Sequence, residues 1–299
     1  MVVIYLTMKE ATDLYPSYIA NCVFNAFSSY TAIMLNIVTI QAIRKTSLPK
    51  PLKTFLLSLG ISDLGVGLFV QPLFIGHLVM KLEEHTESNP TFNTISIATQ
   101  NLFVLASFFG VVSLSADRFL AIHLHLRYQE LVTHKRVVAS VISTWMLSAI
   151  ISMVSVRNRG TVVNVTVGII NAARVITATF FNFKIYVAVQ RHANQIQAFQ
   201  VQQAAQNGGL ANVGRLRKTA VTTVSVYLVF LVCYLRISCT LWINTLTFES
   251  NTVLDVIQMY FLTLVFLNSS LNPLIYCWNM RDIRHNIINI FRNGLSCYN

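Results

Sequence analysis

Polar side chains interrupt a long apolar stretch near the C-terminus. The stretch runs from Val253 to Trp278 and contains NSSLNPLIY at positions 268–276. An unpaired polar group in hydrocarbon costs several kcal/mol, so such side chains should face protein or trapped water. Pro273 removes one helix hydrogen bond and bends the chain. The pattern predicts a bent, polar-lined helix that needs partners on other helices. Its polar residues are Asn268, Ser269, Ser270, Asn272 and Tyr276.

A carboxylate lies in the middle of another apolar run. An isolated charge at the depth predicted for Asp63 costs at least ~2.5–3.5 kcal/mol, so the group should be neutralised, paired or bound to a cation. The polar residues predicted at similar depth are Asn36, Ser107, Asn268 and Asn272. Their oxygens suit a sodium ion with waters or a protonated carboxyl group. A hydrogen-bonded packing core without an ion explains the pattern equally well.

Asp117 and Arg118 stand together at the end of a third apolar run, in SADRFLAI. Adjacent residues on a helix do not face each other directly. The two side chains can still interact locally, and Arg118 can reach toward neighbouring helices. An ordinary charge pair at the membrane interface is the alternative, and the dipeptide alone does not decide between them.

The composition indicates a membrane protein. Of the 299 residues, 54% are hydrophobic and 11% are charged, whereas soluble proteins have about 25% charged residues. The net charge of +11 comes from short clusters between apolar runs. No basic face with interleaved aromatic residues is visible, which argues against nucleic acid as a partner. The five cysteines provide neither a disulfide framework nor metal-binding spacing.

Apolar runs of membrane-spanning length recur along the chain. They cover approximately residues 18–43, 52–80, 92–124, 135–156, 162–191, 213–245 and 252–278. Their number and length predict an all-α membrane protein, a seven-transmembrane helix bundle. Arg174 lies near the middle of the fifth run, which makes that run unusual.

The basic residues predict the orientation of the bundle. One set of connections and the C-terminal tail contains 16 lysines and arginines, the other set contains 4, and Arg174 and Arg236 lie inside runs. Cytoplasmic loops carry the excess of positive charge. We therefore expect residues 1–17 to be extracellular, residues 18–278 to form the membrane domain, and residues 279–299 to be cytoplasmic.

A short amphipathic eighth helix is predicted after Trp278. Its apolar positions are Ile283, Ile287, Ile290 and Phe291, and its polar positions are Arg281, Arg284, His285 and Asn289. Such a helix lies on the membrane surface, so membrane lipid is an expected partner. Cys297 follows the helix and either carries a palmitoyl chain or is unmodified.

Several motifs occur together in a specific order. They are Asn36, LGISD at 59–63, ADRF at 116–119, Trp145 and NPLIY at 272–276. In order, spacing and side of the membrane, the chain resembles a class A (rhodopsin-like) G-protein-coupled receptor over almost its whole length. Three features are similar to the adenosine and melanocortin receptor branch. They are the stretch HLRYQELVTHKRV at 125–137, a short second outer loop near residues 157–161, and the absence of the disulfide that the family usually has in that loop.

The resemblance implies a receptor of the plasma membrane and not an enzyme. Such a receptor senses an extracellular ligand, here unknown and either small or anionic, and activates a heterotrimeric G protein. It needs no cofactor apart from a structural sodium ion. The residues implied for activation and G-protein coupling are Asp117, Arg118, Asn272, Pro273 and Tyr276. Those implied for sodium are Asp63, Ser107, Asn268 and Asn272. Those implied for ligand binding are Gln100, Asn101, Thr166, Asn171, Arg236, Ser238 and Gln258.

The sequence departs from the family pattern in its fifth and sixth runs. Arg236 replaces the usual proline of helix six, and Asn182 replaces a tyrosine of helix five. Arg236 either contacts an acidic ligand group or has a structural role. Gln100 stands where amine receptors have an aspartate, which disfavours an amine ligand. Two alternatives remain open, a signalling-silent receptor-like partner subunit and a seven-helix transporter or channel.

Overall fold

The computed structural model describes residues 2–83, 89–124, 128–157 and 252–296, and the single positions 176, 180, 183, 184 and 187. This part of the chain is helical and contains no strand. In it, 5 helical stretches are long and apolar enough to cross a membrane. They are Tyr15–Lys45, Lys50–Leu82, Pro90–Arg118, His134–Arg157 and Val256–Trp278. The predicted run 213–245 lies outside the described residues, as does run 162–191 except for those single positions.

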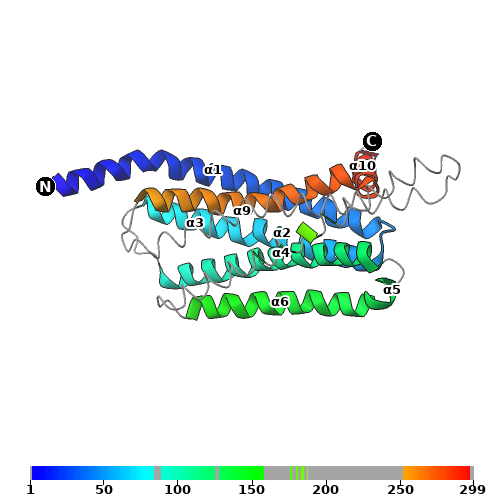
Figure 1. The fold of residues 1–299 in the computed structure, drawn as a ribbon. Helices are drawn as coiled ribbons and strands as arrows, with labels where there is room; N and C mark the ends of the chain where they lie inside the picture. The colour runs from blue at the N-terminus through cyan, green and yellow to red at the C-terminus, as the bar shows by residue number, and fades with distance from the viewer. Residues whose placement is uncertain are drawn as a thin grey trace.

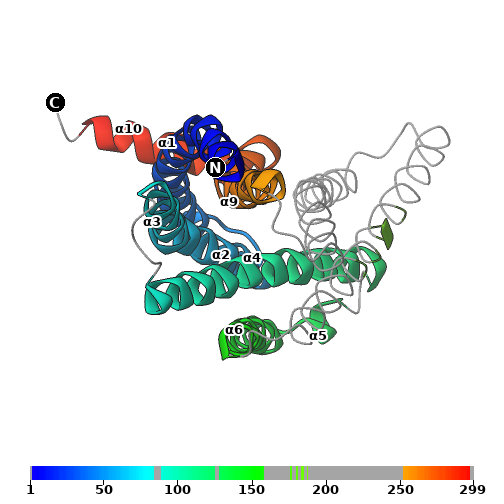
Figure 2. The ribbon, with the colours of Figure 1, turned by 90° about the vertical axis from the view of Figure 1, so that its left-hand side faces the viewer.

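The helices lie lengthwise beside one another (Figure 1). They are α1 (Val2–Lys45), α2 (Lys50–Gly65), η1 (Val66–Val70), α3 (Gln71–Leu82), α4 (Pro90–Leu124), α5 (Tyr128–Leu131), α6 (His134–Arg157) and α9 (Thr252–Asn279). Helix α1 packs against α2, α3 and α9, while α4 packs against α2 and α6. Figure 2 shows the same grouping, with α6 beyond α4. The described helices extend the predicted runs by no more than two residues at each end, except that α1 begins at Val2 and not near residue 18.

Pro72 lies two residues after the π-helical turn η1 of the second span ends. The N–H of Gln71 donates to Val66 O, five residues earlier. In this register the carbonyl of Gly67 would accept from residue 72, but proline has no N–H to donate. Ser29 Oγ of α1 donates to Gly67 O instead, at 2.8 Å. A side chain of α1 therefore satisfies the carbonyl that Pro72 leaves without its helical donor.

Pro273 creates the same need in α9. The missing N–H of proline frees the carbonyl four residues earlier, which belongs to Ser269. Asn36 Nδ2 of α1 donates to Ser269 O at 2.9 Å. In the opposite direction, Ser270 Oγ donates to Ser28 O at 3.2 Å. These bonds fix α1 and α9 to each other where α9 is interrupted by proline.

An aromatic cluster joins α4, α6 and the second span. The ring of Phe103 stacks on Phe69 at a centroid distance of 5.7 Å. Its other neighbour is Trp145, with the rings edge to face at 6.1 Å. Trp145 Nε1 also donates to Ser58 Oγ at 3.1 Å. Phe103 is therefore held from both sides, which restricts where the ring can move.

Helix α10 (Arg281–Ser296) is the amphipathic eighth helix. Ile283 is completely buried, and Ile287 and Ile290 pack against the same core. Phe291, predicted for the same face, is 58% exposed. At 100° per residue, a position eight residues after Ile283 is rotated by about 80°, which turns Phe291 away from the bundle. Asn286 Nδ2 donates to Ala42 O of α1 at 3.4 Å.

Substitution of Gly65 by alanine should destabilise the fold. A Cβ atom there would lie 2.1 Å from a ring carbon of Phe103, and that ring is held by Phe69 and Trp145. Overpacking of this kind costs about 1–3 kcal/mol. We expect Gly65→Ala to lower the thermal unfolding midpoint in detergent. The control is Gly110→Ala, whose Cβ would meet Leu59 at an ordinary 3.4 Å. Equal midpoints for the two variants would contradict this account of the packing.

Candidate functional site

Asp63 lies at the centre of the polar residues predicted from the sequence. Its side chain is completely buried. One carboxylate oxygen accepts from Ser107 Oγ at 2.9 Å, and the other accepts from Asn272 Nδ2 at 2.8 Å. These bonds join α2 to α4 and α9. The predicted contact of Asp63 with Ser107 and Asn272 is therefore present, and each oxygen of the carboxylate has a donor.

Asn36 extends this polar core to α1. Its Nδ2 donates to Ala32 O of its own helix at 2.8 Å as well as to Ser269 O of α9. Asn268 is also buried, but its Nδ2 has no hydrogen-bond partner within the described part of the chain. The core thus connects α1, α2, α4 and α9. Asn268 of α9 does not add a hydrogen bond from its Nδ2 atom to this core within the described part of the chain.

The donor set of the core is rich in oxygen. A carboxylate, a hydroxyl and side-chain amide oxygens are ligands of the kind that hard cations prefer. Among the described residues, no group of three or more His, Cys, Asp or Glu side chains could hold a metal ion. Asp63, Ser107, Asn268 and Asn272, the residues implied for sodium, each carry an oxygen atom of this kind.

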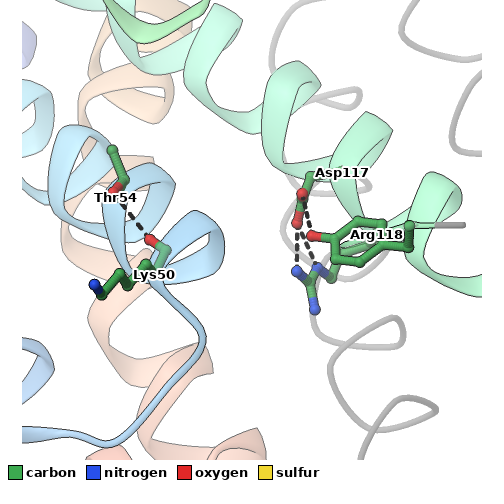
Figure 3. A network of polar contacts seen from close by, with 5 residues as sticks. Lys50, Thr54, Asp117 and Arg118 are labelled. Atoms are coloured by element: carbon green, nitrogen blue, oxygen red, sulfur yellow. Dashed lines mark hydrogen bonds and ion pairs between the residues drawn. The ribbon is translucent and has the colours of Figure 1, made fainter. Parts of the chain in front are cut away.

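Asp117 and Arg118 form an ion pair near the C-terminal end of α4 (Figure 3). Arg118 Nε donates to Asp117 Oδ2 at 3.0 Å, and the terminal nitrogen Nη2 also contacts this oxygen. Although neighbouring residues on a helix point in different directions, the long arginine side chain folds back. The local interaction allowed by the sequence is the one that forms. Thr54 and Lys50 of α2 lie at the same end of the bundle (Figure 3).

Tyr128 of α5 holds the same carboxylate from the other side. Its hydroxyl donates to Asp117 Oδ1 at 2.6 Å. Burial and this bond to Asp117 raise the pKa of Tyr128 above its ordinary value, so the hydroxyl keeps its proton at neutral pH. Sequence reasoning missed Tyr128, although HLRYQEL begins seven residues after Arg118. Arg118 is 6% exposed and so is closed off from solvent in this arrangement.

Tyr276 and Pro273 lie one helical turn apart on α9, and both are buried. The hydroxyl of Tyr276 has no hydrogen-bond partner among the described residues. The position expected to face it, Asn182, lies outside them. The polar end of Tyr276 is thus, like Asn268 Nδ2, a buried polar group of α9 without a partner in the described part of the chain.

The predicted ligand-binding residues are only partly described. Gln100 and Asn101 of α4 and Gln258 of α9 are half-buried. They lie in the first half of their helices, and α4 and α9 begin at the same end of the bundle (Figure 1). Thr166, Asn171, Arg236 and Ser238 lie outside the described residues. The described members of the set thus share one end of the molecule, opposite the Asp117–Arg118 pair.

A second buried polar cluster escaped the sequence reasoning. Asn25 Nδ2 of α1 donates to Asn21 Oδ1 at 2.7 Å and to Thr263 Oγ1 of α9 at 3.0 Å. The spacing of two asparagines four residues apart on an apolar helix was the available signal. Gln71 is also completely buried, and neither polar atom of its side chain has a partner within the described chain. These residues continue the polar interior from Asp63 toward the N-terminal half of α1.

Comparison with known proteins decides the family. The family described as "7 transmembrane receptor (rhodopsin family)" matches residues 35–276. The match begins one residue before Asn36 and ends at Tyr276. The chain belongs to the rhodopsin family of seven-transmembrane receptors. The all-α seven-transmembrane fold predicted from the sequence motifs is thus confirmed. The clusters around Asp63 and around Asp117 and Arg118 belong to this bundle.

Relatives of this rhodopsin-family chain include receptors of two kinds. It is 23% identical to the adenosine receptor A3 of Canis lupus familiaris over 287 residues, which covers 89% of this chain and 88% of that receptor. It is 25% identical to the histamine H2 receptor of Cavia porcellus over 270 residues, covering 82% of this chain and 71% of that receptor. The adenosine receptor agrees with the branch expected from the sequence.

Proposed function

We propose that this rhodopsin-family receptor binds an extracellular ligand at the plasma membrane and activates a heterotrimeric G protein. The observation that supports the proposal best is the closed cluster of Arg118, Asp117 and Tyr128 at one end of the bundle. An arginine held by the carboxylate of its own neighbour, which one tyrosine also holds, can be released by a small movement. The buried polar core around Asp63 supplies a link between the helices that such a movement requires.

The proposed orientation places this cluster in the cytoplasm. In the sequence, the connections and tail that include α5 and α10 contain 16 lysines and arginines, and the other connections contain 4. The positive-inside rule then assigns the N-terminus to the extracellular side and the C-terminus to the cytoplasm. Gln100, Asn101 and Gln258 accordingly lie toward the extracellular end, where a ligand arrives.

Activation is proposed as a shift between two states of the bundle. In the closed state, Asp117 holds Arg118 and Tyr128. A ligand favours the open state only by the difference between its affinities for the two states. In the open state, Arg118 is free to contact the G protein. Asn272, Pro273 and Tyr276 of α9 act as the hinge, because proline weakens the helix there and Asn272 joins it to Asp63.

The ligand proposed here is neutral or anionic. Amide groups such as those of Gln100, Asn101 and Gln258 both donate and accept hydrogen bonds. They suit a polar heterocycle such as adenosine, after which one relative is named, better than a cation such as protonated histamine. A ligand with an ammonium group would find an uncharged amide at Gln100, and no carboxylate to pair with at that position. Arg236 would favour an acidic group on the ligand.

Removal of the Tyr128 hydroxyl should raise basal signalling. A hydrogen bond to a charged group contributes about 1.5–3 kcal/mol, so Tyr128→Phe should increase ligand-independent nucleotide exchange on the G protein about tenfold or more. Arg118→Ala should abolish exchange with any activating compound. Ser155→Ala is the control, because Ser155 Oγ donates only to Ile151 O of its own helix.

The same assay, run over a chemical library, separates a receptor from a signalling-silent partner subunit. The proposal fails if no compound stimulates exchange, if Tyr128→Phe adds no basal activity, and if Arg118→Ala changes nothing. Such a result would support the silent subunit, provided that the variants reach the cell surface in equal amounts.

We further propose that sodium binds at Asp63 in the closed state. A bound ion stabilises the state that binds it by mass action. Sodium chloride should therefore raise the thermal unfolding midpoint of the wild type above that in potassium chloride, and Asp63→Asn should remove this difference. Asp117→Asn is the control, which should retain it. If sodium chloride still raises the unfolding midpoint of Asp63→Asn above that in potassium chloride, the proposed site is disproved. If it does not raise the midpoint of the wild type, an ion-free polar core is favoured.

A further inference from the structure

Two asparagine side chains of the second buried polar cluster have a fixed orientation. Asn25 Nδ2 donates to Asn21 Oδ1 and to Thr263 Oγ1 of α9. The Thr263 hydroxyl also lies within hydrogen-bond distance of Asn21 Oδ1, at 3.0 Å. Turning the amide of Asn21 around would bring two donors together, and turning that of Asn25 would bring two acceptors together. The nitrogen of Asn21 and the oxygen of Asn25 therefore form the other side of this pair.

Buried polar atoms without a partner gather on this other side. Asn21 Nδ2 and Asn25 Oδ1 have no hydrogen-bond partner in the described part of the chain, and the same holds for Ser28 Oγ and for both polar atoms of Gln71. None of the four residues is more than 3% exposed. A buried polar atom left unpaired costs about 1–3 kcal/mol. These five atoms therefore need a partner that the described helices do not supply.

The directions of the helices bring Gln71 to the level of Asn25. Ser29 Oγ of α1 donates to Gly67 O, which fixes α1 beside the second span at that height. The two run in opposite directions (Figure 1). One turn back along α1 and one turn forward along the second span therefore reach the same height, at Asn25 and at Gln71. Ser28, three residues after Asn25, lies on the same side of α1.

The kinds of unpaired atoms indicate the chemistry of the partner. The nitrogens of Asn21 and Gln71 are donors, the oxygens of Asn25 and Gln71 are acceptors, and the hydroxyl of Ser28 can be either. A cation would be repelled by the amide N–H groups, and an anion by the amide oxygens. Water both donates and accepts, and a buried water makes about three hydrogen bonds to groups that are otherwise unpaired.

We propose that water bound inside the bundle joins Gln71 of α3 to Asn21, Asn25 and Ser28 of α1. Five unpaired atoms at about three bonds per water correspond to about two molecules. This site is separate from the polar core of Asp63, because Gln71 follows Asp63 by eight residues, or about 12 Å along the helix. Water thus holds α3 to α1 one turn beyond the direct bond of Ser29. The inference depends neither on signalling nor on sodium.

Hydroxyl-radical labelling of the full chain in nanodiscs tests this, because radicals formed from bound water label the side chains beside it. Phe74 reports on the site, since it follows Gln71 by one turn and its ring meets Phe266 of α9 at 5.2 Å. Phe55 of α2 is the control, because at 5% exposed it is as buried as Phe74 at 6%. After rapid mixing into heavy-oxygen water, Phe74 should first take up ordinary oxygen from the bound water. Phe55 should stay unlabelled.

A variant then shows whether Gln71 holds the water. Gln71→Met removes both polar atoms at similar side-chain length, so the labelling of Phe74 should be lost. The matched control is Gln41→Met, which changes an exposed glutamine of α1 and should retain the labelling.

Three results would overturn the proposal. Equal labelling of Phe74 and Phe55 would show that no water lies beside Gln71. Heavy oxygen in Phe74 from the earliest time would show that bulk solvent enters and that no water is held. Labelling of Phe74 that survives Gln71→Met would show that another group binds the water. The first two results come from the wild type, so they decide the question even if Gln71→Met does not fold.

Discussion

Helices that cross hydrocarbon must satisfy every backbone polar group within the protein. This receptor breaks two of its spans with proline, at Pro72 and Pro273. Each proline leaves a carbonyl without its helical donor, and a side chain of α1 supplies the missing donor. Ser29 reaches Gly67 O at 2.8 Å and Asn36 reaches Ser269 O at 2.9 Å. Each of the two spans therefore depends on α1 for one hydrogen bond to its backbone.

This constraint also positions the residues that the proposed signalling uses. Asn36 bonds the carbonyl of Ser269, and three residues further along α9 Asn272 donates to Asp63. Asp63 in turn accepts from Ser107 of α4, and Arg118 lies nearer the C-terminal end of the same helix. A continuous chain of contacts therefore runs from α1 through α9 and α2 to α4. A change in the bend of α9 would alter the contacts of Asp63 directly.

The sequence predicted those parts of the site that depend on depth and periodicity. Asp63, Ser107 and Asn272 could be placed together because position along an apolar run fixes depth in the membrane. Tyr128 could not be predicted, because its contact with Asp117 depends on how the chain turns after α4. The hydrogen bond from Ser29 to Gly67 O depends on the π-helical register, in which Gln71 donates to Val66 O and not to Gly67 O. The periodicity of the sequence does not reveal this change of register. For α10, periodicity correctly predicted that Ile283 is buried. It wrongly assigned Phe291 to the same face, although Phe291 is exposed.

The most direct test of this account is a double-mutant cycle on Asn36 and Pro273. Pro273→Ala restores the N–H that can donate to Ser269 O, so the carbonyl no longer needs Asn36. The free energy of unfolding in mixed micelles should fall with Asn36→Ala in the wild type. The same substitution should cost about 1 kcal/mol less in the Pro273→Ala background. Additive effects of the two substitutions would contradict the claim that α1 compensates for the prolines.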